Sequence, residues 1–226
     1  QGSGTIQFWA TSSKSLKSTV VTTSWKRDTS DPVIALSLPA VDGENGWYAS
    51  NVIANFTATD AYSGMASKTV SVNGGAAQSL PLTVSDGTQT LLFSALDGAG
   101  HERTAIQTLK IDTVAPALSI SVDDTPNGSG WYTRHPTVSV AGSDNISGVA
   151  SETVQVDAAA PVSGSATLDD GIHTVVFTVK DIAGNVTSQT HTDYRVDATG
   201  PVLAPAYSPG SPDGDHGWFV SEVDVD

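Results

Sequence analysis

An internal repeat of about 84 residues constrains the fold of this 226-residue chain more than any other feature of its sequence. The segment Asp170–Asn185 consists of Asp-Gly, a run that alternates between apolar and polar residues, and Asp-x-x-Gly-Asn. The same pattern, ending in His instead of Asn, occupies Asp86–His101 at an offset of 170 − 86 = 84 residues. A shorter third copy lies at Thr5–Thr11. Self-similarity at a fixed period predicts consecutive copies of one structural unit.

The alternation inside the repeated segment predicts β-strands. Val175, Phe177 and Val179 alternate with more polar neighbours, and a period of two is that of a strand with one buried face. The flanking Asp-Gly and Gly-Asn pairs favour tight turns, because Gly and Asn accept a positive φ. The residues expected in the two cores are Phe56, Leu91, Phe93 and Ala95 in one copy, and Val138, Val140, Val175, Phe177 and Val179 in the next.

Short strands separated by Gly, Pro, Asn or Asp recur along both complete copies. In one copy we expect strands at Val33–Leu38, Val52–Thr59, Thr69–Val72, Leu80–Val84, Thr88–Leu96 and Thr104–Ile111. In the next we expect them at Leu118–Val122, Thr137–Ala141, Thr153–Val156, Ala166–Leu168, His173–Lys180 and Thr190–Val196. Helical periodicity is absent from the sequence. The pattern predicts an all-β fold of antiparallel sandwiches, about seven strands each, strung head to tail.

A proline-containing linker divides the copies. Asp28–Pro32 recurs at Asp112–Pro116 and Asp197–Pro201, at spacings of 112 − 28 = 84 and 197 − 112 = 85 residues. Proline ends one hydrogen-bonded ladder and starts the next domain with φ fixed. The expected units are the C-terminal strands of an incomplete first repeat at 1–29, complete second and third repeats at 30–113 and 114–198, and the N-terminal strands of a fourth at 199–226.

Both ends of the sequence fall inside a repeat. We therefore expect a section of a longer chain, in which neighbouring sequence completes the terminal units. Exchange of strands between molecules is the alternative.

Composition excludes several classes of partner. The formal net charge of −14 argues against nucleic acids and against anionic membrane surfaces. No apolar run approaches the roughly 18 residues of a membrane-spanning helix, so membrane insertion is not expected. The sequence contains no Cys, which excludes disulfides and thiolate chemistry.

Three motifs recur in a fixed order. They are Gly-Trp-Tyr/Phe at Gly46, Gly130 and Gly217, Asp-x-x-Ser-Gly at Asp60 and Asp144, and Asp-x-Ala-Gly at Asp97 and Asp181. With the linker, this order resembles the tandem bacterial Ig-like repeats of large secreted and cell-surface proteins, over the whole chain. The first repeat departs from it, because Ser12 stands where the third motif has Asp. The resemblance implies immunoglobulin-like sandwiches that serve as a stalk, spacer or adhesive module outside the cell, without conserved catalysis.

The acidic motifs are the first set of candidate site residues. Their two loops should lie at the same end of the sandwich as its N-terminus, next to the linker. This places Asp144 and Asp181 near Asp112 at one junction, and Asp60 and Asp97 near Asp28 and Asp31 at the other. Calcium requires six to eight such oxygen ligands. The alternative is that each Asp caps its own turn, and the spacing matches no EF-hand loop.

The repeated tryptophan is the second candidate. Trp47, Trp131 and Trp218 could stack on sugar rings if their indoles were exposed. The alternative is packing, in which each indole shields the open end of its sandwich.

Catalysis finds no support in the sequence. The five histidines occupy unrelated positions, and neither Gly-x-Ser-x-Gly nor His/Cys metal spacing occurs. We therefore expect no enzyme and no cofactor apart from calcium. The leading hypothesis is a structural or adhesive stalk or filament outside a bacterial cell. Its expected partners are neighbouring repeats, other copies in a filament, and surface glycans. The alternative is a set of accessory carbohydrate-binding or spacer modules of a secreted polysaccharide-degrading enzyme.

Overall fold

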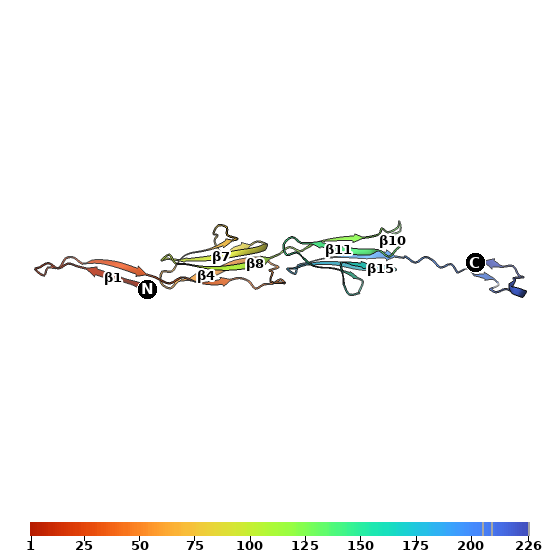
Figure 1. Cartoon of the computed structure of the whole chain (residues 1–226), viewed down its shortest axis with the longest axis horizontal. Coiled ribbons are helices and arrows are strands. Elements are labelled where there is room, and N and C mark those ends of the chain that lie inside the picture. Colours follow the sequence, from red (N-terminus) through yellow and green to blue (C-terminus); the bar gives the residue numbers. More distant parts are fainter. Residues whose placement is uncertain (205, 209, 226) are drawn as a thin grey trace. The chain divides into compact units, whose positions relative to one another are not determined.

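The computed structural model describes residues 1–204, 206–208 and 210–225, so the predicted segment 199–226 lies partly outside the described residues. Strands account for almost all of the regular structure in these residues, together with one 3-10 turn at Asp215–Gly217 (Figure 1). None of the described residues belongs to a helix long and apolar enough to cross a membrane. The predicted all-β fold class of tandem immunoglobulin-like sandwiches is confirmed.

The second repeat consists of two facing three-stranded antiparallel sheets. One sheet has the order β3-β4-β6 and the other β5-β7-β8. The strands are β3 (Val33–Ser37), β4 (Val52–Thr59), β5 (Met65–Val72), β6 (Leu82–Val84), β7 (Gly87–Asp97) and β8 (Glu102–Ile111). Phe56 of β4 and Phe93 of β7 meet edge to face between the sheets, with ring centroids 5.5 Å apart. Both rings belong to the buried hydrophobic core of this repeat.

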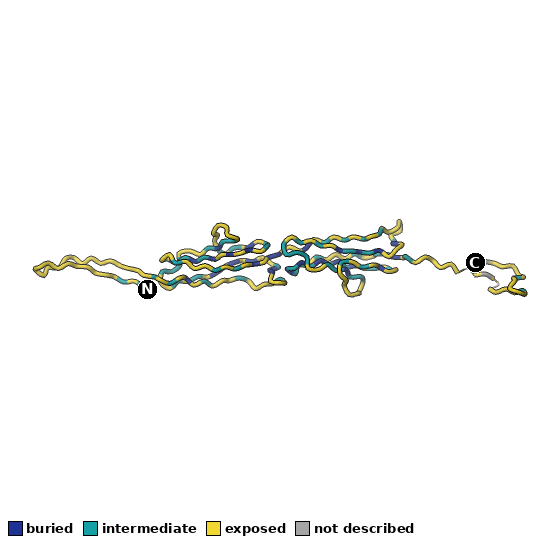
Figure 2. The backbone as a smooth tube through the Cα atoms, viewed as in Figure 1, coloured by how far each residue is buried: buried dark blue, intermediate teal, exposed yellow. Residues whose placement is uncertain are grey.

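The third repeat has the same arrangement of two sheets, with additional short strands. Its sheets have the orders β14-β11-β9 and β10-β16-β15-β12-β13. The strands are β9 (Ala117–Val122), β10 (Trp131–Tyr132), β11 (Thr137–Ser143), β12 (Val149–Val156), β13 (Val162–Ser163), β14 (Ser165–Thr167), β15 (Gly171–Asp181) and β16 (Val186–Val196). All nine residues predicted for the two cores are buried, so the sequence alternation identified the correct buried face of these strands (Figure 2).

Two details of the strands differ from the sequence prediction. β5 begins at Met65 and β12 at Val149, four residues before the predicted starts. In β5, a register shift between Met65 and Ser67 lets the strand pair with β7 directly after the preceding turn. A parallel pairing was also missed: Trp131 and Tyr132 of β10 align with the end of β16, and Tyr48 bridges Ile111 in the same way.

The two terminal segments form isolated strand pairs. β1 (Gly2–Phe8) pairs with β2 (Val21–Arg27), and β17 (Tyr207–Ser208) pairs with β18 (Asp224–Val225). Ile6 and Phe8 are 46% and 55% exposed, as expected for a hairpin without a facing sheet, and Val223 is 40% exposed. The corresponding expectation for the Val225 side chain lies outside the described residues.

The described chain forms two compact units. The first comprises Gln1–Ile120, Val140–Thr153 and Phe177–Gln189, and the second comprises Ser121–Ser139, Val154–Val176 and Thr190–Asp226. The first unit thus contains the second repeat together with one end of the third repeat. This end consists of the linker, the β11–β12 loop and the β15–β16 turn, and is here called the base of the third repeat.

The Phe177→Ala substitution tests the core assignment. Phe177 is fully buried, so its removal should lower the free energy of unfolding by about 3–5 kcal/mol through lost transfer energy and a residual cavity. Ile172→Ala on the same strand is the control, because Ile172 is 62% exposed and its truncation should cost only about 0.5 kcal/mol. Urea unfolding measures both. Equal costs for the two variants would contradict the assignment.

Candidate functional site

The carboxylate of Asp112 is the centre of the candidate site at the base of the third repeat. Asp112 lies in the linker and is fully buried. Its Oδ1 accepts a hydrogen bond from the Val114 amide (3.1 Å), and its Oδ2 accepts one from the Ser147 amide (3.0 Å). A buried charged group requires such partners. Asp112 therefore ties the linker to the β11–β12 loop.

Asp144 and Asp181 meet Asp112 as predicted, and each caps its own turn. Asp144 Oδ1 accepts hydrogen bonds from the amides of residues 146, 147 and 148 at 3.0, 2.9 and 2.8 Å. Asp181 Oδ1 accepts from the amides of Gly184 (2.7 Å) and Asn185 (2.8 Å). One ligand atom from each of the three aspartates lies within 4.8 Å of the others.

Asn185 completes this site and was not singled out in the sequence. Its side-chain amide donates to the carbonyl oxygens of Asp112 (3.0 Å) and Val114 (3.3 Å) and to Asp181 Oδ2 (2.8 Å). One side chain thus joins the β15–β16 turn to the linker. The only signal in the sequence was its place at the end of Asp-x-x-Gly-Asn.

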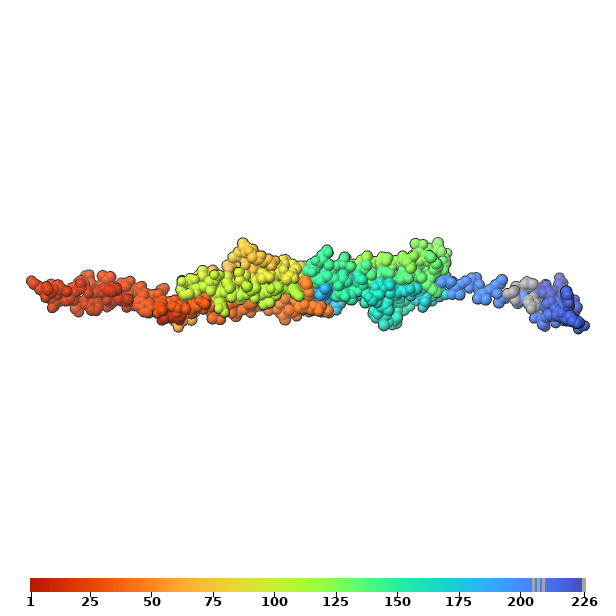
Figure 3. Space-filling view, in the orientation of Figure 1, coloured from red at the N-terminus to blue at the C-terminus, as the bar shows by residue number. Residues whose placement is uncertain are grey.

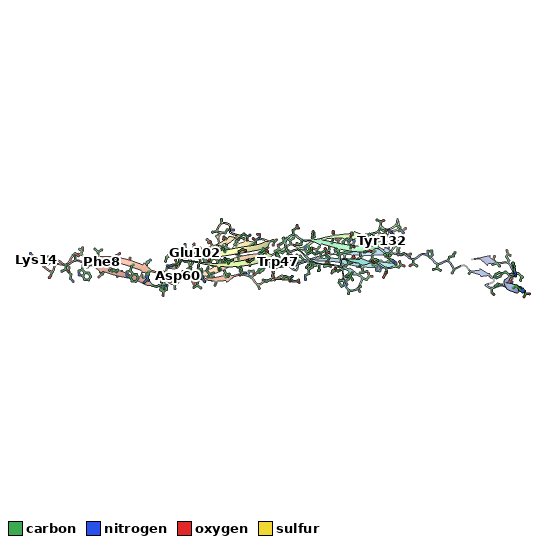
Figure 4. All side chains as sticks on the ribbon, in the orientation of Figure 1. Phe8, Lys14, Trp47, Asp60, Glu102 and Tyr132 are labelled. Atoms are coloured by element: carbon green, nitrogen blue, oxygen red, sulfur yellow. The ribbon has the colours of Figure 1, made fainter. Side chains whose placement is uncertain are left out.

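The base of the second repeat shows the same geometry. Asp28 Oδ1 accepts from the amide and hydroxyl of Ser30 at 3.0 and 2.8 Å, and its Oδ2 accepts from the Ser63 amide at 3.1 Å. Ser63 corresponds to Ser147, since 63 + 84 = 147. Asp60 Oδ1 caps the loop that contains Ser63, and Asp97 Oδ1 caps the following turn through three backbone amides. Asp60 lies at the base of the repeat, and Trp47 lies at its opposite end (Figure 4).

The composition of this second cluster corrects the prediction. His101 replaces Asn185, since 101 + 84 = 185, and its Nδ1 lies 2.8 Å from Asp97 Oδ2. The groups that converge within 4.8 Å are Asp28, Asp97 and His101. Asp31 is exposed and stays outside this group. Asp60 is joined to Asp28 through shared donors, namely the Ser30 hydroxyl (3.4 Å from Asp60) and the Ser63 amide (2.7 Å from Asp60). The sequence analysis missed His101 because it considered only the carboxylates.

Hydrogen bonding sets the protonation of this cluster. The Ser30 amide, together with Ser63, holds the pKa of Asp28 far below its usual value. Burial opposes ionisation of Asp97, but the hydrogen bonds from His101 and the turn amides outweigh it and leave the pKa of Asp97 lowered. The hydrogen bond to Asp97 raises the pKa of His101, and the charges of Asp97, Asp28 and Asp31 add to this effect. The Asp97–His101 pair is therefore an ion pair when the imidazole is protonated.

The hydrogen bonds of the acidic residues show that these residues cap their own turns. Asp60, Asp97, Asp144 and Asp181 each accept two or more backbone amides from their own turn. This is the capping alternative, and it accounts for the burial of the carboxylates without a further ligand. Calcium at the two junctions stays a prediction.

The tryptophans occupy three different environments. Trp47 is 9% exposed, and Lys110 Nζ lies 5.9 Å from the centre of its ring. Its indole is covered, so the predicted glycan stacking is wrong at this position. The chain bends at Gly46 (φ 79°), which allows Tyr48 to enter the core while Trp47 packs outside it. Trp131 is half-buried and Trp218 is 73% exposed, and glycan stacking there stays a prediction.

A second contact joins the second repeat to the base of the third. The loop Asp42–Trp47, here called the donor loop, lies against the turn Asp181–Asn185, here called the acceptor turn. The Glu44 amide donates to the Ala183 carbonyl (2.7 Å), and the Asn45 side chain donates to the Ile182 carbonyl (2.9 Å). Lys180 Nζ also lies 2.5 Å from Glu44 Oε1. Side-chain exposures of 33% and 54% limit this ion pair to about 0–1 kcal/mol.

Comparisons with known proteins found similar solved structures, among them the following two. No family model and no curated protein matches the chain. The fibronectin(III)-like modules of Clostridium thermocellum CbhA share 12% identity over 76% of this chain and 99% of that structure, with a TM-score of 0.34. A tetra-tandem repeat from the extending region of a large adhesion protein shares 20% identity over 92% of this chain, also with a TM-score of 0.34. This chain spans 59% of the length of that second structure.

The Asp97–His101 pair predicts a pH-dependent stability of the second repeat. Because folding raises the pKa of His101, the protonated imidazole stabilises the folded state. This contribution to the free energy of unfolding is fully present below the unfolded-state pKa of about 6.5. The contribution is lost as the pH rises through the higher folded-state pKa. Urea unfolding between pH 5.5 and 9 measures this loss.

His101→Asn is the matched variant, because the third repeat carries Asn185 at the same place. It should remove this part of the pH dependence and leave the part due to His173. Burial lowers the pKa of His173, but its hydrogen bonds to Asp157 and to the Asp169 carbonyl, together with the charges of the two carboxylates, outweigh burial and leave the pKa raised. Identical pH profiles for the wild type and His101→Asn would contradict the assignment.

Proposed function

We propose that this chain is a section of a non-enzymatic, extracellular array of Ig-like repeats that acts as a stalk or spacer, in a structural or adhesive role outside a bacterial cell. The observation that carries the proposal is the use of the recurring polar motifs. Their carboxylates and amides form hydrogen bonds with the linkers and turns of the repeats themselves.

The linkers support a load-bearing role. Asp112 and Pro116, at the two ends of the second linker, are both buried. The Thr187 hydroxyl donates to the Pro116 carbonyl (2.6 Å), and Asn185 donates to two further linker carbonyls. If the linker were mobile, these carbonyl groups would form hydrogen bonds with water instead. A linker held in this way transmits force directly from the last strand of one repeat to the next repeat.

The contact of the donor loop adds a second connection, to the same turn that Asn185 joins to the linker. It uses backbone carbonyls of the acceptor turn, so it depends on the shape of that turn more than on its side chains. Two attachments restrict bending between neighbouring repeats more than either one alone. A spacer that holds a distal domain away from a cell surface benefits from this restriction.

The histidines support a structural role rather than catalysis. His101 pairs with Asp97 inside a turn, and His173 contacts Asp157 (2.8 Å) and the Asp169 carbonyl (2.9 Å). Both imidazoles thus connect a strand end to an adjacent turn. General acid–base catalysis instead requires an imidazole directed at a bound substrate.

Stretching single molecules from their two ends tests this function. A load-bearing array should extend in two separate unfolding events, one for each complete repeat. Each event should lengthen the chain by about 290 Å less the folded length of the repeat, because 84 residues extend by roughly 3.5 Å each.

Phe177→Ala is the matched control for the pulling experiment. It should lower the force of one event and leave the other unchanged, because Phe177 belongs to one core only. Smooth extension at low force, without separate events, would contradict the proposed function.

A further inference from the structure

His173 bridges two exposed turns of the third repeat. Its Nδ1 lies 2.8 Å from Asp157 Oδ2, in the turn after β12, and its Nε2 lies 2.9 Å from the Asp169 carbonyl oxygen, in the turn before β15. The turn after β12 projects from the surface of the repeat (Figure 3). The His173 side chain itself is only 14% exposed, so the ring is held between the two turns.

Both contacts together require the protonated form of His173. An ionised carboxylate and a carbonyl oxygen only accept hydrogen bonds, so each ring nitrogen must carry a proton that it can donate. A neutral imidazole carries one such proton, and the imidazolium carries two. Asp157 remains ionised, because hydrogen bonds from His173 and from the Thr174 amide lower its pKa. The geometry of the bridge is therefore that of a charged ring.

The surrounding charges favour the same form. Burial lowers the pKa of His173, but the two hydrogen bonds and the charges of Asp157 and Asp169 outweigh burial and raise it. A second imidazole lies nearby, since His135 Nε2 is 3.2 Å from Asp170 Oδ1. Hydrogen bonds, first of all from a linker hydroxyl, lower the pKa of Asp170, which is therefore ionised near neutral pH.

The turn before β15 also holds the linker that follows the third repeat. Asp170 Oδ1 accepts a hydrogen bond from the Ala198 amide (2.7 Å), and its Oδ2 accepts one from the Thr199 hydroxyl. Gly171 lets this turn pack on the imidazole, because a Cβ atom there would lie only 3.3 Å from His173 Nε2. His173 thus fixes the position of the turn that caps the linker.

The second repeat builds the same bridge from neutral amides. Gln89 stands at the position of His173, and Asn73 at that of Asp157, since 89 + 84 = 173 and 73 + 84 = 157. The Asn73 side chain donates to Gln89 Oε1 (2.7 Å), and Gln89 Nε2 donates to the Asp86 carbonyl (2.8 Å). Amide side chains do not titrate, so this bridge is the same at every physiological pH.

The neutral bridge supports an equivalent cap on the preceding linker. Asp86 accepts hydrogen bonds from the amide (3.2 Å) and the hydroxyl (3.1 Å) of Thr113, in the linker between the second and third repeats. Asp86 corresponds to Asp170, since 86 + 84 = 170. Two successive linkers are thus capped in the same way, one beside a neutral bridge and the other beside a charged bridge.

We propose that His173 is a pH-sensitive switch that holds the linker after the third repeat when the ring is protonated and releases it when the ring is neutral. Loss of the proton leaves one N–H for two acceptors. This N–H stays with the Asp157 carboxylate, because a charged acceptor binds a donor more strongly than a neutral carbonyl does. The Asp169 carbonyl then loses its donor, and the Asp170 cap on the linker loosens. The switch goes beyond the proposed function, because it operates whatever the array carries or contacts.

The direction of the switch follows from the protonation equilibrium. Because folding raises the pKa of His173, the protonated ring stabilises the bridged state. The bridge is fully present below the unfolded-state pKa of about 6.5 and is lost as the pH rises through the higher folded-state pKa. The linker after the third repeat is therefore held at mildly acidic pH and released at alkaline pH.

Nuclear magnetic resonance of the isotopically labelled chain between pH 5.5 and 9.5 tests the switch. The ring nitrogen resonances of His173 report whether each nitrogen carries a proton, and we expect both to do so at pH 5.5. The methyl resonances of Ala198 and Thr199 report on the linker at every pH, because methyl protons do not exchange with water. They should shift toward unfolded-chain values with the same midpoint as His173. The Thr113 methyl resonance, beside the neutral bridge, should stay constant.

Two variants separate His173 from other titrating groups. His173→Gln combined with Asp157→Asn copies the neutral bridge of the second repeat, and should make the Ala198 and Thr199 resonances independent of pH. His135→Gln removes the second imidazole and should leave the pH dependence of these resonances as it is in the wild type.

Three results would overturn the proposal. The first is a His173 ring that is neutral at pH 5.5 or keeps its protonation state up to pH 9.5. The second is a constant linker resonance at Ala198 and Thr199 while His173 titrates. The third is a wild-type pH dependence in the double variant. The first two are measured on the unmodified chain, so they are decisive even if the double variant does not fold. The pulling experiment does not depend on the switch, so failure of the switch leaves the test of the proposed function intact.

Discussion

The burial of the Asp112 carboxylate in the linker is the constraint on which the rest of the junction depends. A charged group with no exposed surface must be hydrogen-bonded, and its partners here are the amides of Val114 and Ser147. One partner fixes the linker and the other fixes the β11–β12 loop. That loop keeps its shape because Asp144 caps it, and Asn185 adds the β15–β16 turn to the same assembly. The linker is thus part of the fold of the third repeat.

The same junction occurs twice, with one chemical difference that has physical consequences. Asp28 and Asp112 contact equivalent serine amides, at 3.1 and 3.0 Å. The turn partner is an amide at Asn185 and an imidazole at His101. An amide keeps its hydrogen bonds at every physiological pH, whereas the imidazole strengthens its bond by gaining a charge. The two junctions are therefore predicted to respond differently to pH.

The sequence predicted those features that depend on periodicity and topology. Alternation around Phe177 identified the buried face, because the period of a strand is fixed by its geometry. Strand order alone placed Asp144 and Asp181 beside Asp112. The donor loop contact was not predictable in this way, since its acceptors are the carbonyls of Ile182 and Ala183, and backbone groups carry no side-chain signal. The parallel bridge at Tyr48 and the role of His101 likewise depend on neighbours that only the fold brings together.

Amide hydrogen exchange at Ser147 and Glu44 tests the central claim most directly. If the linker and donor loop hold the junction together, both amides should exchange slowly, with protection comparable to that of core strand β7. In Asp112→Asn, Ser147 loses one of its two carboxylate acceptors and keeps the other, Asp144 Oδ1, so its protection should fall in part while β7 stays protected. Asp169→Asn makes the same chemical change at an exposed site and should alter neither amide. Exchange of Ser147 and Glu44 at the rate of unprotected loops, in a wild-type protein whose β7 amides are protected, would contradict the account.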